Sequence, residues 1–318
     1  MPIDRSGVAH RRRTGAPQIA LGPPGVRAYL ADAVVAGGGE LVEPADAEAL
    51  VWGAPAGPDQ LEAAVDEVPD AVWVQLPWAG IEPFVEVLDS DRLWTCGKGV
   101  YAEPVAEHAL ALALAGMRGI GRYARATSWD SEQVGTNLLG ADVVVLGAGG
   151  ITSSFLRLLD PFDCNVTVVR RTPEPVTGAR SVVALAELDD VLPGADLVVL
   201  ALALTPQTIG VIDAARLALL DRHSWLVNVA RGRHIVTDDL VDALSREAIG
   251  GAALDVNDPE PLPDDHPLWR APNGIITPHL GNTQAMALPV LSARVTENVR
   301  RFAAGEPLLG VVDVDAGY

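Results

Sequence analysis

The chain of 318 residues is poor in lysine, in cysteine and in long apolar runs. Its one lysine is Lys98, and its two cysteines are Cys96 and Cys164. Two cysteines exclude a disulfide framework and a cysteine-rich metal cluster, so we expect no disulfide and no bound metal. The longest apolar run, near residues 109–115, is far too short to span a bilayer, which argues against an integral membrane protein.

Positive charge is also scarce, because 23 Lys and Arg residues stand against 42 Asp and Glu residues and leave a formal net charge of −19. Nucleic-acid-binding proteins usually carry a basic face, so we expect no nucleic-acid partner. A basic cluster at residues 10–13 leads into a Thr-Gly-Ala-Pro segment rather than an apolar run, which is not the pattern of a secretory signal. We therefore expect a soluble, cytoplasmic protein with no membrane partner.

The apolar residues, 49% of the chain, form two series in which short strands alternate with helices. This alternation is typical of α/β proteins with parallel sheets, and the length suggests two domains. The first 16 or so residues lack apolar periodicity, and we expect a mobile tail there. In the first series we expect strands at 18–22, 41–43, 49–53, 71–76 and 93–96, and helices at 25–37, 58–67 and 81–89.

A long helix, expected at 102–119, separates the two series. It is apolar nearly all round, so it should be buried between domains or subunits. In the second series the strands 141–146 and 196–200 read ADVVVL and DLVVL, which suits a sheet covered on both faces. The other expected strands are 165–169, 224–228, 251–254 and 274–277, and the other expected helices are 151–159, 185–191, 213–220, 237–247 and 285–304.

A glycine-rich turn, Gly147-Ala148-Gly149-Gly150-Ile151-Thr152, follows the strand 141–146. The first glycine permits a tight bend, and the second lets the backbone approach a pyrophosphate, which then binds at the helix N-terminus. Thr152 replaces the third glycine of a G-x-G-x-x-G motif, so we expect slightly looser packing of helix on strand. We predict dinucleotide binding here, with a purely structural turn as the alternative; the predicted binding residues are Gly147, Gly149, Gly150 and Ile151.

The end of the next strand indicates which dinucleotide binds. An acidic residue there binds the ribose 2′-hydroxyl of NAD, whereas arginine suits the 2′-phosphate of NADP. This strand ends in Arg170 and Arg171, whose guanidinium groups can bind phosphate by charge and by fork geometry. The sequence therefore favours NADP(H), with NAD(H) as the other cofactor, unless the two arginines merely cap an exposed strand end.

Three polar stretches lie just past the carboxyl ends of expected strands, where open α/β sheets bind their ligands. They are NVARG at 228–232, DVNDPEPL at 255–262 and TPHLG at 277–281. With these stretches the sequence resembles the D-isomer-specific 2-hydroxy acid dehydrogenases over about residues 70 to 300. The other matching motifs are the glycine turn at 147–151, AGI at 79–81, VAEH at 105–108 and LTPQT at 204–208.

By this resemblance, Arg231, Glu260 and His279 fall on the family's three catalytic positions. Reduction of a 2-keto acid needs a hydride from nicotinamide and a proton for the carbonyl oxygen. Histidine suits the proton transfer because its ordinary pKa of about 6.5 lies near working pH, and a carboxylate beside it favours the imidazolium form and fixes the ring. An arginine can hold the substrate carboxylate and polarise the carbonyl. Alone, an Arg-Gly is often a turn and a Pro-His an exposed loop, but their joint occurrence favours catalysis.

The resemblance also implies cofactor contacts in the second series. Asp255 would hold the nicotinamide carboxamide, and Thr205 and Pro206 would line the cofactor together with Ala230. We expect His108, on the apolar helix, to be a packed or interdomain histidine rather than a catalytic one.

Substrate contacts are expected from the first series as well. The resemblance implies that the backbone of Trp78, Ala79 and Gly80 binds the substrate carboxylate. The segment 96–101 departs from the family's usual Asn-Thr-Pro-Gly type of turn and carries Lys98 near the proline position. Lys98 is thus a candidate substrate-binding cation, with a solvated loop charge as the alternative.

The family's architecture is discontinuous. It implies a flavodoxin-like substrate-binding domain of residues 1–96 and 285–318 and an NAD(P)-binding Rossmann domain of residues 97–284. Both would be doubly wound parallel sheets, with a cleft that closes on substrate and excludes water. The apolar helix 102–119 would fit a homodimer interface.

Three functions are consistent with the sequence. We favour an NADPH-dependent reductase of a short 2-keto acid, such as glyoxylate or hydroxypyruvate, which yields a D-2-hydroxy acid. A 2-hydroxy acid dehydrogenase that runs in the oxidative direction is the second. The third is a cofactor-sensing, corepressor-like regulator without significant turnover, against which the acidic composition argues.

Overall fold

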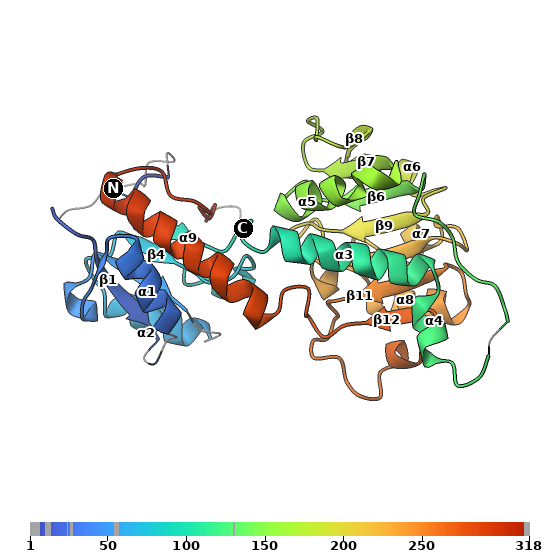
Figure 1. The fold of residues 1–318 in the computed structure, drawn as a ribbon, viewed down its shortest axis with the longest axis horizontal. Helices are drawn as coiled ribbons and strands as arrows, with labels where there is room; N and C mark the ends of the chain where they lie inside the picture. Colours follow the sequence, from blue (N-terminus) through green and yellow to red (C-terminus); the bar gives the residue numbers. More distant parts are fainter. Residues whose placement is uncertain are drawn as a thin grey trace. The chain divides into compact units, whose positions relative to one another are not determined.

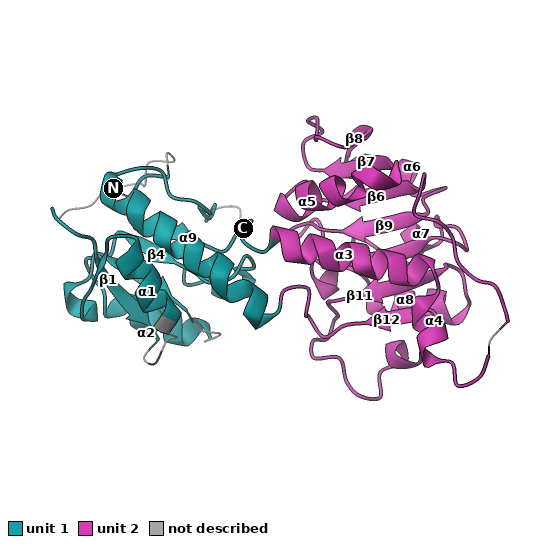
Figure 2. Ribbon diagram, viewed as in Figure 1, with its two compact units in different colours: residues 1–101, 283–318 teal, residues 102–282 magenta. Residues whose placement is uncertain are grey.

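The computed structural model describes residues 7–9, 14–23, 25, 28–53, 57–129 and 131–314. Figure 2 colours the two compact units of the chain: unit 1 comprises residues 1–101 and 283–318, and unit 2 comprises residues 102–282. The crossings expected after residues 96 and 284 lie near these boundaries. The assignment of one unit to substrate and the other to cofactor stays a prediction.

Unit 1 is a parallel five-stranded sheet with helices on both faces (Figure 1). Its strand order, β2-β1-β3-β4-β5, is that of flavodoxin-like doubly wound folds. The strands are β1 (Gln18–Gly22), β2 (Glu40–Leu41), β3 (Ala49–Trp52), β4 (Trp73–Gln75) and β5 (Leu93–Thr95). The helices are α1 (Ala28–Ala36), α2 (Pro58–Asp66) and α9 (Gln284–Ala304).

The strands of unit 1 contribute side chains to two apolar cores, one on each face of the sheet, because successive side chains of a strand point to opposite faces. Val51 lies in the core with α1 and α9, whereas Leu50 and Trp52 lie in the core with α2. Trp73 of β4 meets Phe302 of α9 with ring centroids 5.1 Å apart. The C-terminal helix is therefore part of the first unit's core.

Two predictions for unit 1 are wrong. The expected helix 81–89 is only a short 3-10 helix (Glu82–Phe84), because β-branched valines and the aspartate Asp89, which accepts backbone N–H groups, do not favour a helix. The expected mobile tail is wrong around Ala9, which is 5% exposed, and Gly7, whose carbonyl accepts from Leu308 N at 2.9 Å. Residues 1–6 and 10–13 of that tail lie outside the described residues.

Unit 2 is a parallel seven-stranded sheet of order β12-β11-β10-β9-β6-β7-β8. In chain order from its first strand this is 3-2-1-4-5-6 with one strand added, the Rossmann arrangement. The strands are β6 (Asp142–Leu146), β7 (Asn165–Arg170), β8 (Ser181–Ala184), β9 (Leu197–Leu200), β10 (Trp225–Asn228), β11 (Gly251–Leu254) and β12 (Gly274–Ile276). The helices are α3 (Ala102–Met117), α4 (Ile120–Arg125), α5 (Gly150–Leu159), α6 (Leu188–Val191), α7 (Ala214–Leu217) and α8 (Thr237–Ser245).

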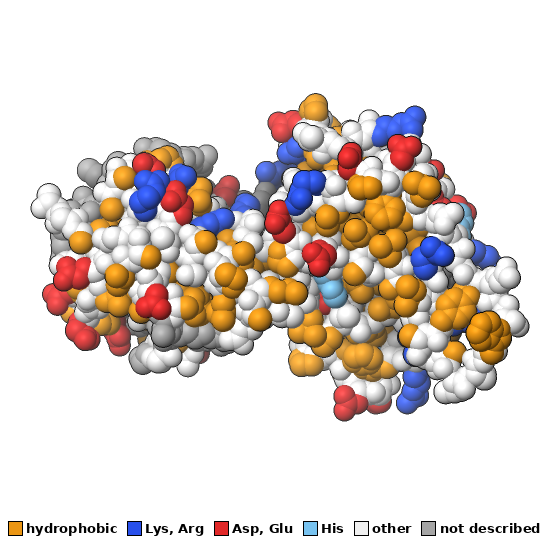
Figure 3. All heavy atoms as spheres, in the orientation of Figure 1, with side chains coloured by type: hydrophobic (Ala, Val, Ile, Leu, Met, Phe, Trp, Pro, Cys, Tyr) orange, Lys and Arg blue, Asp and Glu red, His pale blue; other side chains and the backbone are white. Residues whose placement is uncertain are grey.

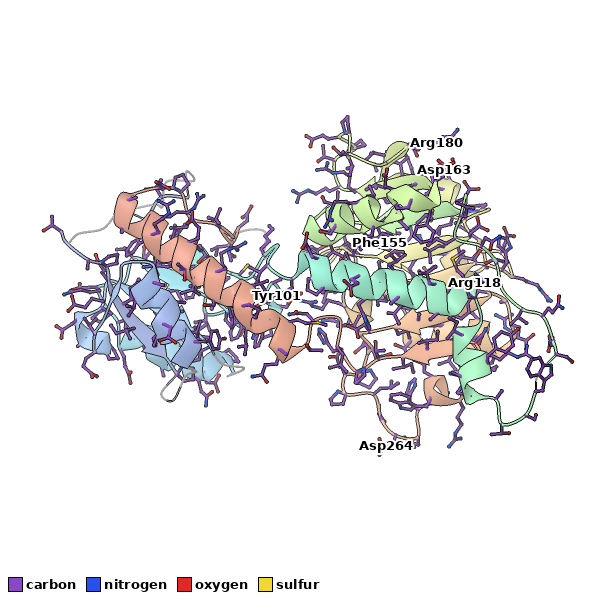
Figure 4. All side chains as sticks on the ribbon, viewed as in Figure 1. Tyr101, Arg118, Phe155, Asp163, Arg180 and Asp264 are labelled. Atoms are coloured by element: carbon purple, nitrogen blue, oxygen red, sulfur yellow. The ribbon has the colours of Figure 1, made fainter. Side chains whose placement is uncertain are left out.

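The sheet of unit 2 is covered on both faces, as its apolar strands indicate. Val143 and Val145 face a core that contains α3 and α5, whereas Val144 and Leu146 face a core that contains α6, α7 and α8. Phe155 of α5, labelled in Figure 4, is 1% exposed within the first of these cores. In the described ranges no helix is long and apolar enough to cross a membrane.

Three local expectations for unit 2 need correction. The strand β8 was not expected, because SVVA is short and only partly buried at the edge of the sheet. The helix expected at 213–220 is a single turn, α7. The helix expected at 102–119 ends at Met117, and a second helix, α4, begins after Gly119, whose φ of 62° is left-handed.

Candidate active site

The glycine turn of unit 2 has the geometry of a phosphate cradle. Gly147 has a φ of 106°, and a Cβ atom there would lie 2.2 Å from the carbonyl oxygen of Ala201, so the bend requires glycine. Gly149 differs, because a Cβ atom there would meet nothing within 4 Å. The N-terminus of α5 thus faces open space at Gly149 and Gly150, both exposed, where an anion can bind backbone N–H groups. The residues present fit a dinucleotide pyrophosphate.

Thr152, in the place of the motif's third glycine, is fully buried in the first turn of α5. Its hydroxyl donates to the carbonyl oxygen of Gly147 at 2.9 Å. The side chain therefore holds the two ends of the turn together and leaves no unsatisfied hydroxyl in the core. Ile151, beside it, is half-buried against the core under α3.

The arginine pair lies at the carboxyl end of β7, beside the strand that leads into the glycine turn. Arg170 pairs with Glu174 at 3.4 Å, and the Arg170 side chain is 28% exposed. Arg171 is exposed. A long, exposed ion pair of this kind contributes little to stability, so a phosphate could replace Glu174 at small cost.

The loop after β9 carries Thr205 and Pro206 and is fixed from two sides. Thr208 Oγ1 donates to the carbonyl oxygen of Ala203 at 2.8 Å and accepts from Thr205 N at 2.8 Å. His234, fully buried, places its two ring nitrogens 2.9 Å from the Thr208 carbonyl oxygen and 3.3 Å from that of Leu202. The predicted cofactor-lining residues therefore lie on a rigid turn.

The Arg231 loop at the end of β10 is held by Asn228, for which the sequence pattern predicts no catalytic or binding role. Asn228 is fully buried; its Oδ1 accepts from Ala230 N at 3.0 Å and its Nδ2 donates to the Arg231 carbonyl oxygen at 2.9 Å. A Cβ atom at Gly232 would lie 1.9 Å from the carbonyl oxygen of Asn257, so glycine lets this loop meet the next one. The sequence feature that could have indicated this role is a lone asparagine at the end of the apolar strand β10.

His279 and Glu260 form a direct pair across the loops after β12 and β11. His279 Nδ1 lies 2.6 Å from Glu260 Oε1, and their side chains are 54% and 40% exposed. Exposed ion pairs contribute little to stability, so the effect of this contact is on the orientation of the ring rather than on the fold. Because Nδ1 faces the carboxylate, Nε2 is the ring nitrogen left to exchange a proton with a ligand.

The backbone at His279 is left-handed, with a φ of 54°, a conformation that is uncommon for residues other than glycine although histidine adopts it more often than most. His279 N donates to the carbonyl oxygen of Asp255 at 2.8 Å. The Asp255 carboxylate, 3% exposed, accepts from Leu280 N and Gly281 N at 2.8 Å and from Thr277 Oγ1 at 2.6 Å. Asp255 therefore fixes the loop that presents His279.

The pKa of Asp255 reflects these contacts. Burial by itself raises the pKa of this carboxyl group. Hydrogen bonds from the side chains of His108 and Thr277 and from the backbone at Leu280 and Gly281 outweigh burial, and the pKa falls to about 2. Asp255 is thus a buried anion that the loop after β12 and His108 of α3 already satisfy, and the carboxamide contact predicted for it stays a prediction.

The predicted substrate loops of unit 1 lie side by side at the carboxyl ends of β4 and β5. Gly97 N donates to the Trp78 carbonyl oxygen at 2.7 Å, and a Cβ atom at Gly97 would lie 2.7 Å from the carbonyl oxygen of Pro77. Trp78, Ala79 and Lys98 are exposed, and Gly80 is half-exposed.

In unit 2 the structure brings together the three loops that carry Arg231, Glu260 and His279, at the carboxyl ends of β10, β11 and β12. Across the described ranges, no group of three or more His, Cys, Asp or Glu side chains could hold a metal ion. A glycine-rich phosphate cradle and a His–Glu pair at the ligand-binding edge of a Rossmann sheet are features typical of a nicotinamide-dependent oxidoreductase.

Comparison with known proteins identifies the family. Residues 109–281 match the model of the D-isomer specific 2-hydroxyacid dehydrogenase NAD binding domain, so the chain belongs to this family and is an NAD(P)-dependent oxidoreductase. An uncharacterized protein in the proB 3′ region of Corynebacterium melassecola is 39% identical over 297 residues, which are 90% of this chain and 95% of that protein. Glyoxylate/hydroxypyruvate reductase A of Serratia proteamaculans is 37% identical over 175 residues, 55% of each chain.

Solved structures of similar proteins have the same fold over nearly the whole length of this chain. A D-isomer specific 2-hydroxyacid dehydrogenase from Xanthobacter autotrophicus, in complex with NADPH and MES, is similar with a TM-score of 0.82 and 27% identity over 96% of this chain and 100% of that one. An NADPH-dependent glyoxylate/hydroxypyruvate reductase from Sinorhizobium meliloti, in complex with NADP and sulfate, has a TM-score of 0.79 and 25% identity over 95% of this chain and 100% of that one.

Proposed function

We propose that this protein reduces a small 2-keto acid of the glyoxylate or hydroxypyruvate class to the D-2-hydroxy acid, with NADPH as reductant. The observation that carries the proposal is the 2.6 Å contact between His279 and Glu260 in the same unit as the glycine cradle. Similarity to reductases of these two acids supports the substrate class.

The chemistry divides between cofactor and protein. NADPH supplies the hydride when it is bound. His279 donates a proton from Nε2 to the carbonyl oxygen, while Glu260 holds Nδ1–H and stabilises the imidazolium form. Arg231 binds the substrate carboxylate and polarises the carbonyl, because a guanidinium offers two parallel donors to a carboxylate.

The preference for NADP(H) rests on the arginines at the end of β7. Arg170 and Arg171 bind the 2′-phosphate, and Gly147, Gly149, Gly150 and Ile151 form the pyrophosphate cradle. Two observations support this preference for NADP(H). Positions 170 and 171 carry arginine rather than the acidic residue that binds the ribose of NAD. Two similar solved structures contain NADPH or NADP. The cofactor-lining residues proposed beside them are Thr205, Pro206, Ala230 and Asp255.

Further substrate contacts come from unit 1 in this proposal. The backbone at Trp78, Ala79 and Gly80 binds the acid, and Lys98 adds positive charge to a chain with a net charge of −19. The two loops already lie together through the Gly97–Trp78 hydrogen bond. Lys98→Ala should raise KM for the keto acid more than KM for NADPH.

The test of the function is turnover by the purified protein. NADPH absorbance is followed with a panel of 2-keto acids, and NADH is compared under the same conditions. We expect saturable NADPH oxidation with glyoxylate or hydroxypyruvate. Tight NADPH binding without turnover of any acid would refute the reductase and favour a cofactor-sensing regulator.

We also propose that the protein is a homodimer. Figure 3 shows apolar side chains on the face of unit 2 that α3 crosses. The segment after α3 adds exposed apolar residues, among them Trp129 at 94%, Leu139 at 66% and Ile120 at 53%. Monomers rarely leave such patches open. Light scattering during gel filtration should give twice the 33.3 kDa chain mass, and Trp129→Ser should weaken the dimer.

A further inference from the structure

The buried carboxylate of Asp255 accepts hydrogen bonds from the loop after β12 and from one residue of a different element, α3. His108 lies on α3, and its Nε2 is 3.2 Å from Asp255 Oδ1 and 3.0 Å from Thr277 Oγ1. The hydroxyl of Thr277 donates to the same Oδ1 at 2.6 Å, so it is free to accept from the histidine. The His108 N–H therefore bridges the strand end at Asp255 and the residue that starts the catalytic loop.

The loop is bound to this carboxylate on both sides of His279, although Pro278, directly before the histidine, has no N–H to donate. Thr277 precedes it, Leu280 and Gly281 follow it, and all three donate to the two oxygens of Asp255. Their donation holds His279 in its left-handed backbone conformation. A shift of the carboxylate therefore moves the loop and, with it, the imidazole that faces Glu260.

The contact between α3 and this loop is also tight in its packing. A Cβ atom at Gly281 would lie 2.9 Å from Asp255 Oδ2 and 3.5 Å from Cδ2 of His108. Glycine at 281 is thus what lets the loop's N–H reach the carboxylate under the histidine ring. The His108 side chain is 22% exposed, so the bridge is largely shielded from water.

We propose that His108 is a positioning residue for the catalytic histidine. It acts through Asp255 and Thr277: its Nε2–H fixes the carboxylate, and the carboxylate fixes the loop that presents His279 to Glu260. His108 itself touches neither the reacting atoms nor the cofactor in this role. The kinetic part of its test rests on the proposed reductase activity.

The kinetic experiment uses the full-length protein with NADPH and its best keto acid. Small displacements of a catalytic group cost up to about 100-fold in rate, so we expect His108→Ala to lower kcat about 10- to 100-fold while KM for the keto acid, which Arg231 binds, changes less than about twofold. His108→Gln keeps a donor near Nε2 and should recover most of the lost kcat. A merely structural role would not separate kcat from KM and would not be rescued by a donor.

A matched control is available in the same unit. His223 Nε2 pairs with Asp196 Oδ1 at 3.1 Å, a contact of the same kind at the amino ends of the strands. His223→Ala should leave kcat unchanged. Equal losses in His108→Ala and His223→Ala, or a folded His108→Ala with unchanged kcat, would overturn the proposal.

A second readout does not depend on turnover. Long-range 1H–15N spectra report which ring nitrogen of a histidine carries the proton, and the six histidines can be assigned by substitution. In the wild type we expect His279 to be protonated at Nδ1, toward Glu260; in His108→Ala we expect a mixture of tautomers, and in His108→Gln the wild-type pattern. An unchanged His279 signal in both variants refutes the proposal even if no keto acid is reduced. If His108→Ala does not fold, the His279 signal is compared between His108→Gln, which keeps a donor, and His108→Leu, which does not. The proposal requires the wild-type pattern in His108→Gln and a mixture of tautomers in His108→Leu.

Discussion

At the scale of single residues, the site is defined by groups whose charge or backbone has been fixed by neighbours. Asp255 is the clearest case, because four donors keep its buried carboxylate ionised. Asn228 likewise fixes the Arg231 loop, because its side chain accepts from Ala230 N and donates to the Arg231 carbonyl oxygen. His279 and Glu260, the two side chains proposed for proton transfer, are exposed, so their geometry depends on these buried polar residues.

The depressed pKa of Asp255 predicts a pH dependence of stability. Its folded pKa of about 2 lies below the unfolded value of 3.8, so the ionised group contributes stability above about pH 4 that is lost as the pH falls toward 2. The contribution is about 2 kcal/mol. In Asp255→Asn we expect the free energy of unfolding at pH 7 to be lower by about 2 kcal/mol and to lose less on acidification. Urea unfolding at several pH values measures both; parallel curves for the two proteins would contradict the assignment.

The arginine pair predicts a cofactor switch. Charge-assisted hydrogen bonds are worth about 1.5–3 kcal/mol, so Arg170→Ala with Arg171→Ala should raise KM for NADPH about 10- to 100-fold and leave KM for NADH nearly unchanged. Steady-state kinetics with both cofactors measure this. Equal changes for the two cofactors would show that the arginines only cap the strand.

At the scale of elements, the turn between β6 and α5 separates two uses of glycine. At Gly147 the backbone itself needs glycine, whereas a Cβ atom at Gly149 would meet no protein atom within 4 Å and would fill only the space proposed for the phosphate. The turn also shows which features a sequence pattern can reveal. A strand, a glycine turn and a helix are contiguous, so their pattern is readable; His108 and Thr277 are 169 residues apart, and only the packing of α3 brings them together.

This difference predicts a paired result. Gly149→Ala should lose little stability and bind NADPH about 5- to 100-fold more weakly, since crowding a packed contact costs about 1–3 kcal/mol. Gly147→Ala should lose stability, because the new methyl group meets the Ala201 carbonyl. Thermal unfolding and fluorescence titration with NADPH measure the two effects. Wild-type NADPH affinity in Gly149→Ala would argue against a phosphate cradle.

Sequence patterns also failed at particular elements for physical reasons. The edge strand β8 has few buried residues, so it gives a weak apolar signal. The segment 81–89 forms only one short 3-10 helix, and at its end the Asp89 carboxylate accepts from the backbone N–H groups of Asp91 and Arg92, which favours a turn over a longer helix. The role proposed for His108 depends on a contact with a distant part of the chain, which no local pattern encodes, whereas Asn228 binds residues two and three positions further on and could be recognised as an asparagine at the end of an apolar strand.

At the scale of the whole molecule, the chain starts and ends in unit 1 and encloses unit 2 in sequence. Helix α9 supplies core residues to unit 1, and Asn298, fully buried, donates to Gln75 Oε1 at 2.8 Å and accepts from Leu309 N at 2.8 Å. The first 101 residues therefore lack part of their own core. Cys96 and Cys164 are free thiols, and the cytoplasmic location stays a prediction.

Separate expression of the parts tests this organisation. Residues 102–282 contain both cores of unit 2 and should fold and bind NADPH alone. Residues 1–101 alone should not fold, because the face covered by α9 is exposed to water. Circular dichroism and cooperative unfolding decide; a cooperatively folded 1–101 fragment would contradict the role of α9.

The most direct measurement compares wild-type protein with His279→Ala for 2-keto acid reduction and for NADPH binding. Loss of a general acid lowers kcat about 100- to 10,000-fold, and the dissociation constant of NADPH should change less than about twofold, because the glycine cradle is untouched. Keto-acid turnover that survives in His279→Ala, or NADPH binding that is lost with it, would contradict proton transfer by His279.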